Sequence, residues 1–142
     1  MKIIDNSIQL ACALFPEVYA SKKKYQSFHF TFIYERNKLI SIGQNIIDIP
    51  NAKAIKFAKK FGTVEPYRSK FLHAEISALS KLYGKFHIDG RLKLVSLRLN
   101  KDMKLCNSKP CENCQIVLDA FGLNRVWYSN QEGKIENDYS PK

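Results

Sequence analysis

Two short stretches of the sequence decide the fold that we predict: HAE at 73–75 and PCENC at 110–114. Cys111 and Cys114 are three residues apart, which on a helix places both sulfurs on one face, close enough to share an ion. Zinc accepts nitrogen and sulfur donors in a tetrahedral arrangement, and with three protein ligands its fourth position is open to water. The two stretches therefore predict a catalytic zinc site with His73 as the third ligand.

The cysteine pair is expected at the start of a helix over residues 111–121. Pro110 suits a helix start, because the amide hydrogen that proline lacks is not needed there. The backbone amides and the dipole of the first turn favour anions, so they lower thiol pKa values and prepare thiolates for a metal. Gly122 is expected to cap the other end of this helix.

Glu75 is the residue that we predict to move protons. Positions two apart on a regular helix point in different directions, so His73 and Glu75 reach one ion only if they sit at the helix start. Apolar residues recur at helical intervals over 76–83, and Gly84 ends the run. Glu75 would then stand beside the metal without binding it, and could take a proton from water and pass it to a leaving group.

These motifs resemble the zinc-dependent cytidine and deoxycytidylate deaminase superfamily, whose signature is His-x-Glu followed by Pro-Cys-x-x-Cys. The resemblance covers roughly residues 27–137. It implies an α/β fold of three layers, α-β-α, with a central mixed sheet of about five strands flanked by helices. It also implies Zn²⁺ as the cofactor, with Glu75 as the catalytic acid and base. We expect a single domain over residues 1–142.

The same resemblance names candidate substrate-binding residues. In Gly43-Gln44-Asn45, which is similar to the family's Gly-x-Asn, Asn45 would bind the sugar. Ala74 would offer its backbone amide to the carbonyl of the base. Ser108, just before the cysteine helix, and Tyr128, as a stacking partner for the base or as a core residue, complete the set.

Other interpretations of the cysteines and histidines stay open. A Cys-x-x-Cys pair alone is as often redox-active, although a redox pair needs no His-x-Glu upstream. Cys106 lies five residues before Cys111 and could close a four-ligand structural zinc site, or could be a small apolar filler. His29 and His87 are expected to be packing or surface residues.

Composition narrows the class of protein. The 142 residues include four cysteines, too few for a disulfide scaffold, and no long apolar segment near the start, so we expect a cytoplasmic protein without membrane spans. The net charge of +10 predicts attraction to phosphate. Residues 51–70 carry six bases and one acid, which is typical of a solvated helix face or of a phosphate-capturing approach to the site.

Periodicity predicts the remaining elements. A helix over 3–20 should end or kink at Pro16. Strands at 28–34 and 39–46 should form an antiparallel hairpin, and a basic helix should follow at 54–61, ended by Gly62. Further strands are expected at 92–100, 125–129 and 134–137, the last two joined by a connection so short that it permits only antiparallel pairing.

That short connection affects the expected substrate. The resemblance implies a helix between the last two strands in deoxycytidylate, transfer-RNA adenosine and polynucleotide deaminases, whereas free-nucleoside deaminases have the hairpin but carry cysteine in place of His73. We predict a homo-oligomeric hydrolytic deaminase that converts a cytosine-type base to uracil in a nucleotide such as dCMP. The first alternative is a deaminase of single-stranded DNA or RNA, for which Tyr25, Tyr67 and Phe71 supply aromatic rings. The second is a non-catalytic, zinc-stabilised nucleic-acid-binding module.

Overall fold

The computed structural model describes residues 2–22, 24–25, 27–46, 51–61 and 72–137. Its elements in chain order are α1 (Lys2–Ser21), β1 (Ser27–Glu35), β2 (Lys38–Gln44), α2 (Ala52–Phe61), α3 (Ala74–Leu82), β3 (Leu92–Asn100), β4 (Leu105–Cys106), α4 (Glu112–Ala120), β5 (Arg125–Ser129) and β6 (Ile135–Glu136). Gly62 and the loop residues Pro66 to Lys70 lie outside the described residues.

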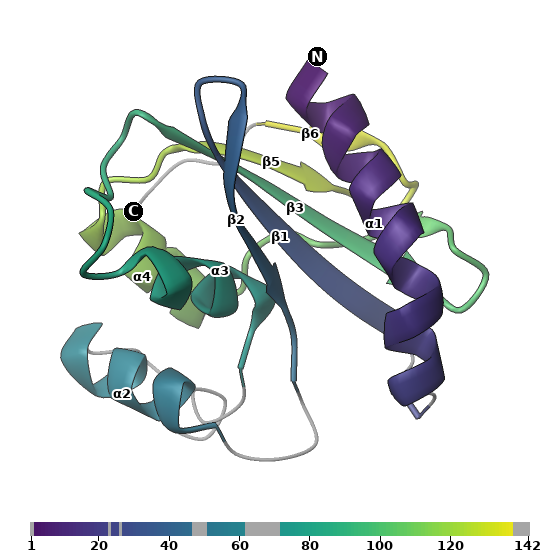
Figure 1. The fold of residues 1–142 in the computed structure, drawn as a ribbon, viewed down its shortest axis with the longest axis horizontal. Helices are drawn as coiled ribbons and strands as arrows, with labels where there is room; N and C mark the ends of the chain where they lie inside the picture. Colours follow the sequence, from purple (N-terminus) through teal and green to yellow (C-terminus); the bar gives the residue numbers. More distant parts are fainter. Residues whose placement is uncertain (1, 23, 26, 47–50, 62–71, 138–142) are drawn as a thin grey trace.

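The strands form one mixed sheet with helices on both of its faces (Figure 1). The strand order is β2-β1-β3-β5-β6, with β4 beside β3. Helix α1 packs on one face, where it forms a core with Phe28, Phe30 and Phe32 of β1. Helices α2, α3 and α4 form a second core on the other face. The predicted α/β architecture, a central mixed sheet flanked by helices, is confirmed.

Both predicted hairpins are present. β1 and β2 are antiparallel and connect through Arg36, whose positive φ of 57° makes the tight turn. β5 and β6 are also antiparallel, whereas β5 runs parallel to β3, with α4 in the crossover. The sequence did not predict β4, which lies end to end with β5 along the same edge of β3, opposite Arg98 and Leu99.

Helix α1 corrects the expectation for Pro16. The helix does not end there but continues to Ser21, although Pro16 donates no backbone hydrogen bond. Aromatic packing stabilises the turn that follows. The ring of Tyr19 stacks on Phe15 at a centroid distance of 5.5 Å and meets the edge of Phe28 at 5.9 Å. Packing of this helix on the sheet therefore outweighs the local cost of the proline.

Gly43 brings β2 unusually close to α3. A Cβ atom at this position would lie 2.1 Å from the carbonyl oxygen of Ala74 and 2.4 Å from the amide nitrogen of Ala78. Only glycine leaves room for this approach, which holds the start of α3 against the end of β2. Ser41, on the same strand, reinforces the contact by donating a hydrogen bond of 2.8 Å to the Ala78 carbonyl.

The sheet face beneath α3 and α4 changes character along the strands. Cross-strand pairs of β1 and β3 run from Ile33–Leu94 through Thr31–Ser96 to His29–Arg98. Ile33 and Leu94 belong to the apolar core under these helices, and the alternation of side chains puts the other two pairs on the same face. The floor of the sheet is thus apolar at one end and polar at the other.

Candidate active site

Three side chains from two helix starts converge on one point. His73 is the N-cap residue of α3, Cys111 is the N-cap residue of α4, and Cys114 lies in the first turn of α4. His73 Nδ1 lies 3.4 Å from Cys111 Sγ and 3.3 Å from Cys114 Sγ. The three candidate ligand atoms all lie within 4.8 Å of one another, so a single ion could contact all of them.

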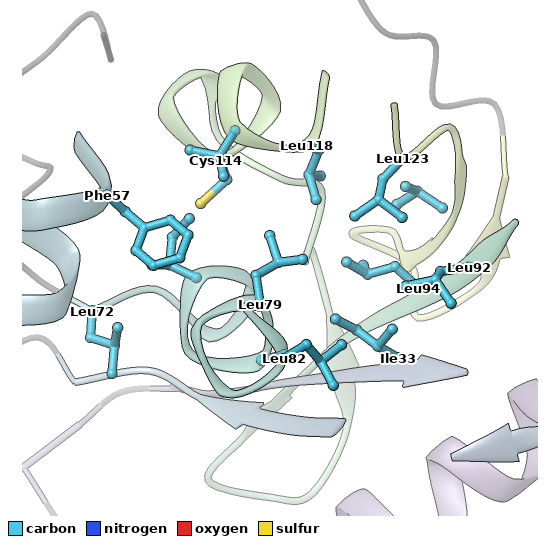
Figure 2. Close-up of a cluster of buried hydrophobic side chains, with 14 of the residues drawn as sticks. Ile33, Phe57, Leu72, Leu79, Leu82, Leu92, Leu94, Cys114, Leu118 and Leu123 are labelled. Atoms are coloured by element: carbon cyan, nitrogen blue, oxygen red, sulfur yellow. The ribbon is translucent and has the colours of Figure 1, made fainter. Parts of the chain in front are cut away.

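The local sequence explains how these atoms meet. Pro110 precedes the N-cap residue instead of occupying the first helical turn, so the expected position of the proline is wrong while that of the cysteines in the first turn holds. Neither His73 nor Cys111 makes a side-chain capping hydrogen bond, which leaves both side chains free to face each other. Figure 2 shows Cys114 in the apolar cluster that joins α4 to α3, with Leu79 and Leu118.

The protons of this cluster are shared. The hydrogen bond from the Cys114 thiol, followed by that from His73, lowers the pKa of Cys111 to about 4, despite its burial. The hydrogen bond to Cys111 and burial raise the pKa of Cys114. The pKa of His73 is raised, chiefly by its hydrogen bond to Cys111. One thiolate thus holds the protons of its two neighbours, and a divalent cation can replace them.

Glu75 lies beside this cluster in a nearly dry environment. Its side chain is 1% exposed, and burial raises the pKa of its carboxyl from 4.5 to about 7. Within the described parts of the chain, Oε1 of Glu75 has no hydrogen-bond partner. A carboxyl with a pKa near neutrality can both accept and return a proton at cell pH, which is the requirement for a general acid and base.

The donor set fits zinc. One imidazole nitrogen and two sulfurs are ligands that zinc binds in catalytic sites with an open fourth position, and the unpartnered oxygen of Glu75 is a polar group close to that position. Cys106 does not belong to the group found among the described residues. Its thiol instead donates to the Arg98 carbonyl at 3.5 Å, which argues against the four-ligand structural alternative.

The candidate substrate-binding residues differ in what they can offer. Asn45 is 8% exposed, and its Oδ1 accepts a 3.0 Å bond from the His29 backbone, which leaves the side-chain amide hydrogens for another partner. Ala74 opens α3, where amides have no acceptor within the helix. Tyr128 is 3% exposed within the core. The roles of these residues in binding a substrate stay predictions.

Ser108 has a structural place in the site. Its hydroxyl donates to the Ser96 carbonyl at 2.6 Å and accepts a bond from the Ser129 amide at 2.9 Å. The side chain is fully buried, so it joins the turn before α4 to β3 and β5. Binding of a substrate by this hydroxyl stays a prediction, and its observed bonds hold Cys111 at the correct height above the sheet.

Sequence reasoning missed the polar end of the sheet floor. His29, treated there as a packing residue, is buried and places Nδ1 3.8 Å from Oε1 of Glu75. Its Nε2 lies 2.5 Å from Ser96 Oγ, and Nη2 of Arg98 lies 3.4 Å from Nδ1. Burial, followed by the positive charge of Arg98, lowers the pKa of His29 well below its usual range, so the ring is neutral. A histidine among alternating phenylalanines was the available signal.

The basic and aromatic residues give a mixed result. Lys56, Lys59 and Lys60 are exposed on α2, as expected for a solvated face. Tyr25 is 3% exposed and stacks on Phe28, so the expectation that its ring is available to a nucleic acid is wrong. Tyr67 and Phe71 lie outside the described residues. Within the described residues, no helix combines the length and hydropathy needed to span a membrane.

Comparisons with known proteins found no matching family model and no matching curated protein. Two solved structures are similar. One is the dCMP deaminase from the cyanophage S-TIM5 in apo form (TM-score 0.46, 20% identity, 72% of this chain and 66% of that chain). The other is the cytidine deaminase from Mycobacterium leprae (TM-score 0.45, 16% identity, 85% of this chain and 87% of that chain). The chain thus spans just under two thirds of the phage enzyme.

Proposed function

We propose that this chain is a zinc-dependent hydrolytic deaminase that converts a cytosine-type base to uracil, with a nucleotide such as dCMP as the substrate. The observation that carries the proposal is the convergence of His73, Cys111 and Cys114 beside the buried carboxyl of Glu75. A purely structural zinc site would give no reason to bury an unpaired carboxyl next to three ligands, because an unsatisfied buried polar group destabilises the fold.

The ligands and the carboxyl divide the chemistry. A zinc ion held by the three ligands would act as a Lewis acid that activates water for attack on C4 of the base. Glu75 would take a proton from that water, place a proton on N3 and then protonate the departing amino group. The net reaction forms a C4–O bond and breaks the C4–N bond, so that water is consumed and ammonia is released.

The surrounding residues would orient the base and sugar. The backbone amide of Ala74, at the positive end of α3, would donate to the carbonyl oxygen at C2 of the base. The side-chain amide of Asn45 would donate to a sugar hydroxyl while its oxygen stays bound to β1. The positive net charge would favour a phosphorylated substrate over a free nucleoside.

The decisive experiment measures ammonia release from cytidine, CMP, dCMP and a short cytosine-containing oligonucleotide. Glu75→Gln should reduce turnover about 100-fold to 10,000-fold, because it removes the proton carrier. Zinc content, measured by mass spectrometry of the metal, should stay at one ion per chain, since Glu75 is not among the three grouped ligands. Normal turnover in this variant would disprove the proposed chemistry.

A deaminase of single-stranded DNA or RNA is the second candidate, favoured by the exposed lysines of α2. A strand that contacts several phosphates loses affinity steeply with salt, whereas a mononucleotide does not. Titration of binding between 50 and 200 mM salt should therefore leave the affinity for dCMP within about tenfold, and a loss of about 1,000-fold for the oligonucleotide would favour the strand. Zinc binding without any ammonia release would instead favour a non-catalytic module.

A further inference from the structure

His29 occupies a hydrogen-bond network that fixes which of its ring nitrogens carries the proton. The Ser96 hydroxyl has a single hydrogen, and it donates this hydrogen to the Ser108 carbonyl at 2.9 Å. The same oxygen lies 2.5 Å from Nε2 of His29. Because Ser96 has already used its hydrogen, it must accept from His29, so Nε2 carries the ring proton.

The other ring nitrogen therefore presents a lone pair. Nδ1 accepts from the Arg98 guanidinium at 3.4 Å and faces Oε1 of Glu75 at 3.8 Å. This distance is longer than a hydrogen bond, but bonds of catalytic groups are often long in the free enzyme and shorten when the substrate binds. Among the described residues, Oε1 of Glu75 has no other partner for a hydrogen bond.

We propose that His29 is a positioning residue for Glu75, which holds the carboxyl in orientation by accepting a hydrogen bond at Nδ1 while Glu75 carries the transferred proton. The inference rests on the proposed function, because only the deaminase cycle loads Glu75 with a proton in every turnover. The network continues from Ser96 to Ser108 in the turn before α4, so one set of hydrogen bonds sets the positions of both Glu75 and Cys111.

Two substitutions separate positioning from structural support. His29→Gln keeps an N–H group where Nε2 bonds to Ser96 but has no acceptor at the place of Nδ1. His29→Asn has the opposite property, since its short amide reaches only the place of Nδ1. Positioning predicts that His29→Gln lowers kcat about 10-fold to 100-fold, with KM, zinc content and Tm close to the wild type, and that His29→Asn retains more kcat but a lower Tm.

Thr31→Val is the matched control. Thr31 is the next residue on the same face of β1, it is fully buried, and its hydroxyl has no hydrogen-bond partner within the described residues. Its replacement by an isosteric apolar residue should leave kcat and KM unchanged. A purely structural role for His29 predicts the reverse order of the two variants, with His29→Gln near wild-type kcat and His29→Asn impaired, and that order would overturn the inference.

A second readout does not depend on turnover. In the zinc-loaded full chain, nitrogen NMR of the histidine rings should show Nε2 of His29 protonated and Nδ1 unprotonated. Glu75→Gln, which places an amide donor opposite Nδ1, should shift the Nδ1 resonance and leave Nε2 unchanged. A proton on Nδ1, or an unmoved Nδ1 resonance, would overturn the contact. If the wild type releases no ammonia from any substrate, the proposed function fails and this resonance alone decides the contact.

Discussion

Replacing Gly43 by alanine tests how closely β2 and α3 must approach for the site to form. The added Cβ would meet two backbone atoms, the Ala74 oxygen at 2.1 Å and the Ala78 nitrogen at 2.4 Å. Backbone atoms cannot rotate away as a side chain can, so α3 must move outward by about 1 Å to reach ordinary contact distances. This shift displaces His73 and Glu75, because both lie at the start of α3.

The expected cost is near the upper end of the range for overpacking, about 3 kcal/mol in the free energy of unfolding. For a chain of 142 residues this corresponds to a Tm about 10 °C lower. Turnover should fall by up to about 100-fold, since a misplacement of about 1 Å at a catalytic group has effects of this size. Urea denaturation, calorimetry and ammonia release would measure the three quantities.

Gly84→Ala serves as the control for Gly43→Ala. Gly84 has a φ of +83°, and an added Cβ would meet nothing within 4 Å, so only the backbone conformation resists alanine. The expected cost is about 1 to 2 kcal/mol, with turnover preserved. If Gly43→Ala were no less stable than Gly84→Ala and kept full turnover, the close approach of β2 to α3 would not be what positions the site.

Two further predictions concern the ligands and the carboxyl. Cys106→Ser should retain one zinc per chain, whereas Cys114→Ser should lose it, because only Cys114 belongs to the group with His73; loss of zinc from Cys106→Ser would revive the four-ligand site. In the metal-free protein, the pKa of Glu75 is raised from 4.5 to about 7, so its contribution to stability is greatest below pH 4.5 and is lost as the pH rises through 7. Glu75→Gln should therefore stabilise the metal-free protein at pH 8 relative to pH 5 by up to about 3 kcal/mol in urea denaturation, and an equal effect at both pH values would contradict the buried carboxyl.

The metal cluster could be predicted from the sequence because its information is local. A spacing of three residues fixes the two cysteines on one helical face, and a helix start is the only place where His73 and Glu75 can share an ion. The alternating phenylalanines of β1 and the short connection between β5 and β6 were similarly local signals. These features therefore appeared in the structure with small errors at their boundaries.

The floor of the site could not be predicted because it depends on pairing between distant strands. His29 reaches Ser96 and Arg98 only because β1 and β3 pair in one particular register, across about 70 residues of sequence. β4 was missed because two residues carry too little pattern to identify a strand. The continuation of α1 past Pro16 depends on a tertiary contact, between Tyr19 and Phe28, that local rules do not include.

The two helices that carry the ligands both begin without an ordinary cap. A serine or aspartate at such a position would bond to a first-turn amide and contribute about 1 kcal/mol, but His73 and Cys111 make no such bond. An ion bound between them would cross-link the first turns of α3 and α4 and restore the order that the missing caps leave out. Metal loading and completion of these two helices are then a single event, and the protein gains its shape at the site at the same moment as its chemistry.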